Sequence, residues 1–105
     1  NIFIGISELP EEELDLYAVF GSHAKETARK DSDIDLLCVT SNKNKIETAV
    51  ASIKRRYNLD IQAVIIPKTE FVKIKSENPE FWSDLINYGI IFKGYELFYY
   101  YAYGT

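Results

Sequence analysis

Two aspartates and a glycine–serine pair are the residues whose types and spacing best indicate chemistry. Asp33 and Asp35 open an apolar run, and Gly21-Ser22 follows an earlier one. Side chains of a strand alternate between its faces, so both carboxylates would point the same way, roughly 6.5–7 Å apart along the backbone. Two carboxylates on one face repel each other unless a cation lies between them, and magnesium prefers such oxygen ligands.

Gly21-Ser22 has the properties of a phosphate-binding turn. It supplies a tight turn with free amides and a hydroxyl, and magnesium commonly binds together with phosphates. Residues 24–28 (AKETA) are good helix formers, which places a helix N-terminus just after this pair. Lys25 and Arg29 are close enough in sequence to add positive charge, although they could equally point to water.

The spacing of these residues resembles a known family signature. Ten residues separate Ser22 from Asp33. The pattern G-S-x10-D-x-D is similar to that of the DNA polymerase β-like nucleotidyltransferases, in particular the small stand-alone minimal members (MNT proteins). Each half alone is a weak signal, and the combination at this spacing is strong. The resemblance covers most of the chain, and its diagnostic part runs from Gly21 to Asp35.

The surrounding elements predict an α/β domain with a mixed sheet. Residues 17–20, 34–40 and 59–66 are apolar and strand-like. Between the last two, Ser41 is expected to cap a helix with an apolar stripe at i, i+3, i+4, i+7 and i+11: Ile46, Ala49, Val50, Ile53 and Tyr57. A strand–helix–strand unit is a right-handed crossover, so these two strands should be parallel.

This topology makes Asp60 the third acid of the predicted site. Asp60 begins its strand, as Asp33 and Asp35 begin theirs, and parallel strands begin at the same end of a sheet. Gly21-Ser22 ends its own strand, so the first strand must run antiparallel to the second if the pair is to reach the acids. The family resemblance also implies a third acid on a later strand.

The remaining segments carry weaker signals. Residues 1–6 fit either a strand or the tail of a preceding element, and residues 7–16 fit a short helix after Pro10. Residues 68–76 are expected to be helical, Asn78-Pro79 should start another helix that Gly89 ends, and residues 90–92 resemble a short strand. Residues 95–105 contain five tyrosines, which fit either core packing or a contact with a partner or a second copy.

The resemblance implies a reaction and roles for the residues. It implies transfer of AMP from ATP to a hydroxyl, with two magnesium ions held by Asp33, Asp35 and Asp60, the last near the acceptor. Gly21, Ser22, Lys25 and Arg29 would bind the triphosphate. Minimal members frequently pair with a small helical HEPN protein, and some attach AMP to a tyrosine of that partner. Family members often have arginine at the places of His23 and Lys25, so the phosphate contacts are expected to differ.

Composition sets the limits of these interpretations. A chain of 105 residues with 47% hydrophobic and 27% charged residues suits one globular domain. Because the sequence begins at Asn1 and contains no methionine, we expect that an N-terminal segment precedes it. A net charge of −4 does not favour broad nucleic-acid binding, and no run is long enough to span a membrane. The single cysteine, Cys38, fits a reducing cytoplasm and reads as a small buried hydrophobe.

Two other functions use the same residues. The first is an antitoxin-like binding module that keeps the fold and masks a toxin partner without turnover. The second is a phosphohydrolase that uses the acidic residues, for which Gly21-Ser22 at this spacing is not required.

Overall fold

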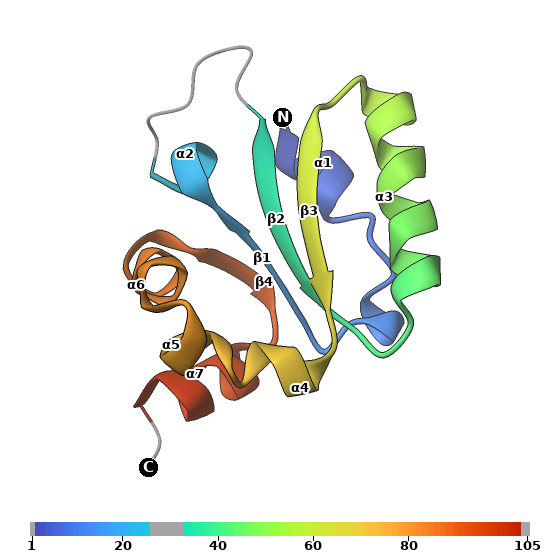
Figure 1. Ribbon diagram of the computed structural model, residues 1–105. Coiled ribbons are helices and arrows are strands. Elements are labelled where there is room, and N and C mark those ends of the chain that lie inside the picture. Colours follow the sequence, from blue (N-terminus) through green and yellow to red (C-terminus); the bar gives the residue numbers. More distant parts are fainter. Residues whose placement is uncertain (1, 26–32, 104–105) are drawn as a thin grey trace.

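A four-stranded mixed sheet forms the centre of the molecule (Figure 1). The structure is a computed structural model that describes residues 2–25 and 33–103. The strand order is β3-β2-β1-β4. Strand β1 (Leu16–Phe20) pairs antiparallel with β2 (Ile34–Val39) and with β4 (Ile90–Lys93), and β2 pairs parallel with β3 (Ile61–Ile66). The predicted mixed sheet is therefore confirmed, as are the directions of its first three strands.

Helices cover both faces of this sheet. On one face lie α1 (Ile2–Ile6) and α3 (Lys43–Tyr57), where Leu36 and Cys38 of β2 are buried. On the other, Leu37 and Val39 are buried beside α4 (Lys68–Phe71), α5 (Ile74–Glu77), α6 (Pro79–Tyr88) and α7 (Tyr95–Tyr103). Two covered faces explain why β2 is almost continuously apolar after its first two residues.

Helix α3 fixes the crossover between the two parallel strands. Its N-cap is Asn42, whose side chain accepts from the Lys45 N–H at 3.4 Å, so the predicted cap Ser41 was wrong by one position. The residues buried on the sheet are the first, third and fourth of the predicted stripe, namely Ile46, Val50 and Ile53. Asn58 ends the helix in the left-handed conformation, at a φ of 53°, and the chain then turns into β3.

Several short elements differ from their sequence-based predictions. The strand alternative for residues 1–6 is wrong because the segment forms α1, and the helix expected over residues 7–16 is only the 3-10 turn η1 (Glu11–Glu13). The helix predicted at residues 68–76 is divided into α4 and α5. The turn predicted at residues 24–28 begins earlier, as α2 (Gly21–Ala24), and residues 26–32 lie outside the described part.

Cys38 has the environment of a core residue. Its side chain is fully buried, and burial raises the pKa of its thiol to about 12. It therefore behaves as a small hydrophobe, as predicted. Within the described residues, no helix combines the length and the apolar character needed to cross a membrane.

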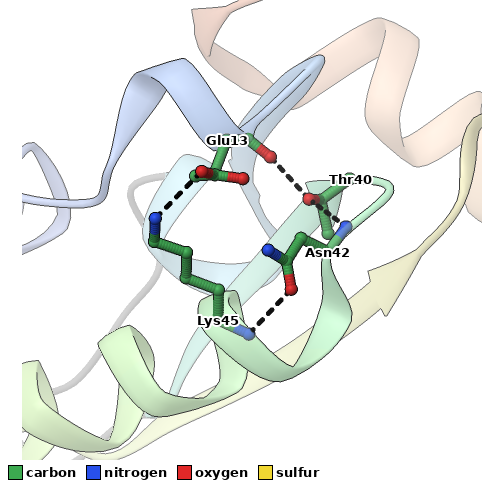
Figure 2. A network of polar contacts seen from close by, with 4 residues as sticks. All are labelled: Glu13, Thr40, Asn42 and Lys45. Atoms are coloured by element: carbon green, nitrogen blue, oxygen red, sulfur yellow. Dashed lines mark hydrogen bonds and ion pairs between the residues drawn. The ribbon is translucent and has the colours of Figure 1, made fainter.

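A buried hydroxyl connects the end of β2 to the start of α3 (Figure 2). Thr40 follows β2 and is 2% exposed; its Oγ1 donates to the Glu13 carbonyl and accepts from the Asn42 N–H at 3.0 Å. The Lys45 ammonium lies 2.9 Å from the Glu13 carboxylate and lowers the pKa of that group. Side chain and backbone thus connect η1, the end of β2 and the start of α3.

We expect Thr40→Val to lower the free energy of unfolding by about 1–3 kcal/mol, because two backbone groups lose a partner in a buried position. Urea denaturation measures the change. Thr40→Ser keeps the hydroxyl and should cost only about 1 kcal/mol for the lost methyl. An unchanged free energy of unfolding in Thr40→Val would show that the hydroxyl contributes nothing.

Candidate active site

The register between β1 and β2 brings the glycine turn against an acidic side chain. Phe20, the last residue of β1, lies opposite Asp35. The next residue, Gly21, has a φ of +72°, and a Cβ placed on it would lie 2.2 Å from Oδ2 of Asp35. Glycine adopts this backbone conformation readily, and it alone has no Cβ that would overlap the carboxylate. The turn and the acid, which are far apart in sequence, therefore meet at one end of the sheet.

The register between β2 and β3 places the third acid beside the other two. Ile34 pairs with Ile61, Asp35 pairs with Gln62, and the Ile34 N–H donates to the Asp60 carbonyl at 2.8 Å. Continuing this register by one residue sets Asp33 opposite Asp60. Residues opposite each other in a sheet share a face, so the three acids lie on the same face and at the same end. Both strands start at this end in Figure 1.

The acids share a face, but they do not form a closed cluster. Asp33 and Asp60 are exposed and Asp35 is half-buried, while Oδ1 of Asp60 accepts from the Gln62 side chain at 3.3 Å. Among the residues that the structure describes, no three His, Cys, Asp or Glu side chains are gathered closely enough to hold a metal ion. The donor set is all oxygen, which fits magnesium, and Asp33 and Asp35, two residues apart on one face, could hold it.

The predicted phosphate-binding residues are placed only in part. The first amides of a helix have no partner within it, and α2 begins at Gly21, beside Asp35. The backbone of Ser22 lies in α2, whereas the side chains of Ser22 and His23 and the whole of Arg29 are outside the described part. The roles of these residues, like those of the three acids, stay predictions.

Lys25 contacts α6, which sequence reasoning missed. Its Nζ lies 2.6 Å from Oδ1 of Asp84 and 5.2 Å from the centre of the Tyr88 ring. The hydrogen bond that Lys25 donates to the Asp84 carboxylate is the main reason why the pKa of Lys25 is raised. Asp84 and Tyr88 are one turn apart on α6, so their spacing in the sequence predicts that they share a face of the helix. The spacing does not predict that this face contacts Lys25. The contact connects the end of α2 to α6.

The fold and this site define a class of protein: a mixed-sheet α/β domain with acids at the start of two parallel strands, facing a glycine turn. The family comparison agrees. The chain matches the model of the family described as "Polymerase beta, Nucleotidyltransferase" over residues 6–95. It belongs to that nucleotidyltransferase family, which confirms the resemblance inferred from the G-S-x10-D-x-D pattern. Comparison of the sequence with curated proteins gives no match.

Solved structures with a similar fold include chains from toxin–antitoxin complexes. A chain of a toxin–antitoxin with AMP-PNP has a TM-score of 0.65 at 17% identity and covers 94% of this chain and 79% of that chain. A chain of a mutant of the toxin–antitoxin MntA-HpeT has a TM-score of 0.66 at 15% identity and covers 97% of this chain and 81% of that chain. A chain of another MntA-HpeT mutant has a TM-score of 0.56 at 13% identity and covers 96% of this chain and 76% of that chain. At these identities the similarity establishes the shared fold alone.

We expect Gly21→Ala to lower the free energy of unfolding by about 2–5 kcal/mol, because alanine resists a positive φ and its methyl would overlap Asp35. In an Asp35→Ala background the overlap is removed, and the same substitution should cost only about 1–2 kcal/mol. Chemical denaturation of the four proteins gives the coupling directly. Identical costs in both backgrounds would contradict the contact.

Proposed function

We propose that the protein is a magnesium-dependent nucleotidyltransferase that transfers AMP from ATP to a hydroxyl of a protein partner. The observation that supports this proposal best is the contact between the Gly21 turn and Asp35. It sets the amides at the start of α2 beside a carboxylate that shares its face with Asp33. A triphosphate and its cation require such a combination of donors and acidic ligands.

Each residue has a role in the proposed transfer. Asp33 and Asp35 would hold magnesium, which when bound neutralises phosphate charge and aligns the reacting oxygens. The amides that begin α2 would bind the triphosphate. The acceptor oxygen attacks the α-phosphorus, the bond to the bridging oxygen breaks, and pyrophosphate leaves. Asp60, opposite Asp33 in the register, would take the proton of the acceptor hydroxyl.

The aromatic surface of α7 supports a protein contact. Tyr95, Tyr99 and Tyr103 follow one another by one turn, with ring centres 6.3 and 5.7 Å apart, and each is more than half exposed. Exposed aromatic side chains in a continuous row are typical of interfaces. Phe98 alone is buried under this helix. We propose that this row contacts a helical HEPN-type partner or a second copy. The toxin–antitoxin complexes that contain chains of similar fold support a protein partner in general.

We expect Asp33→Asn and Asp35→Asn each to reduce transfer by about 100-fold or more, because each removes a carboxylate that would hold magnesium. The measurement uses ATP labelled at the α-phosphate, magnesium and the partner protein that co-purifies. Asp15→Asn is the matched control: it makes the same change on an exposed residue just before β1, at the other end of the sheet, and should leave labelling unchanged.

Label on the partner that disappears in both site variants and persists in Asp15→Asn would support the enzyme. If no label appears at any time, while both site variants neutralise the partner as well as the unaltered chain does, the protein is a silent binding module. Release of inorganic phosphate from ATP without label transfer would indicate the phosphohydrolase instead.

A further inference from the structure

The outer edge of β3 carries backbone groups that the sheet leaves unpaired. Strand β3 is the last strand on its side, and β2 is its only neighbour in the described sheet. The carbonyls of Asp60 and Ile66 accept from β2 and from Thr40, so the even-numbered residues turn their backbone groups inward. Ile61, Ala63 and Ile65 must turn theirs outward. None of these outward groups has a hydrogen-bond partner within residues 2–25 and 33–103.

Two grooves lie along this edge, one on each face of the sheet. A groove of about 350 Å³ is lined by Val64 and Ile66 of β3 together with Ile74, Phe81 and the charged Glu70, Lys73 and Glu77. A groove of about 210 Å³ on the other face is lined by Ile61, Ala63 and Ile65 together with α3, which contributes the charged Glu47 and Lys54. Side chains of a strand alternate between faces, so a strand placed beside β3 would direct them into the two grooves in turn.

The opposite edge of the sheet differs in the features that discourage strand pairing. Strand β4 has four residues, ends in Lys93, and pairs with β1 through a register shift. Short length, lysine and irregular pairing are the usual protections of an edge strand. Strand β3 has six residues in regular register, and none of them is charged.

We propose that the outer edge of β3 binds an extended segment of a partner polypeptide, which joins the sheet as a fifth strand. The segment forms backbone hydrogen bonds with Ile61, Ala63 and Ile65, and places its side chains alternately in the two grooves. This is the mode of recognition in which main-chain pairing gives affinity and alternating pockets give specificity.

The groove beside α3 favours a lone segment over a second copy of this chain. Helix α3 and β3 together line this groove, so α3 packs beside the edge strand on this face. Two copies paired through β3 would bring their strands to about 4.8 Å, whereas helix axes need about 8–10 Å. The two α3 helices would therefore collide. A segment without a covering helix meets no such obstacle.

The edge is continuous with the proposed active site. Asp60 immediately precedes β3, so a segment that pairs along the strand has one end beside the acids. A hydroxyl residue at that end of the segment is the acceptor. This consequence rests on the proposed function, whereas binding at the edge requires neither ATP nor magnesium.

The test uses a soluble fluorescein-labelled decapeptide of alternating valine and threonine with a lysine at each end. We expect saturable binding by fluorescence anisotropy without ATP or magnesium, unchanged in Asp33→Asn, so that failure of catalysis does not affect the result. On binding, the Ala63 and Ile65 amides should exchange with solvent at least about tenfold more slowly, because they gain partners, while the Gln62 and Val64 amides stay protected throughout.

Two matched pairs of variants locate the binding on the edge. Val64 is 38% exposed, so Val64→Lys should leave the fold intact and weaken binding at least about tenfold by introducing a charge at the edge, whereas Val64→Thr should bind normally. Ala63→Pro removes an outward N–H and should also weaken binding at least about tenfold. Its control, Ala63→Ser, keeps this N–H and should bind normally. Circular dichroism verifies that each variant is folded.

Three results would overturn the proposal. The first is absence of binding at millimolar peptide concentration. The second is equal binding of a peptide with every central amide N-methylated, which cannot donate to the edge. The third is self-association of the protein that Val64→Lys abolishes, which would assign the edge to a second copy.

Discussion

The pairing register of β1 with β2 is the constraint on which the site depends. Phe20 opposite Asp35 sets Gly21 directly against the carboxylate, in a space that no other residue could leave open. A slip of one residue would exchange the faces of β2, turning both aspartates toward the α3 side and moving Leu36 and Cys38 into the positions where Leu37 and Val39 now pack against α4 to α7. Burial on both faces therefore fixes the register. The same apolar contacts that stabilise the core thus determine the position of the acids.

The second constraint is the crossover through α3. It makes β3 parallel to β2, and parallel strands begin at the same end, so Asp60 reaches the face of Asp33. Both constraints act through the backbone of the sheet and leave the acid side chains exposed or half-buried at its end. Acids at such an open end are accessible to a nucleotide and to a partner from solvent.

The sequence predicted those parts of the fold that local patterns determine. The strands, the stripe of α3, the Asn78-Pro79 start of α6 and the mixed direction of the sheet follow from periodicity, caps and crossover handedness. The errors were made where such patterns are short: one apolar segment of five residues forms α1 although its composition also suits a strand. The contact of Lys25 with Asp84 was not predictable, because it depends on how α2 and α6 approach across the sheet end.

The small size of the domain leaves its acids and one edge of its sheet uncovered. The acids lie at one end of a sheet only four strands wide, and no further element of the described chain covers β3 on its outer side. An enzyme that must exclude water and align an acceptor needs more surface than these elements provide. A partner that pairs with β3 would supply that surface at the strand where Asp60 stands. Recognition of the acceptor and completion of the active site would then be the same event.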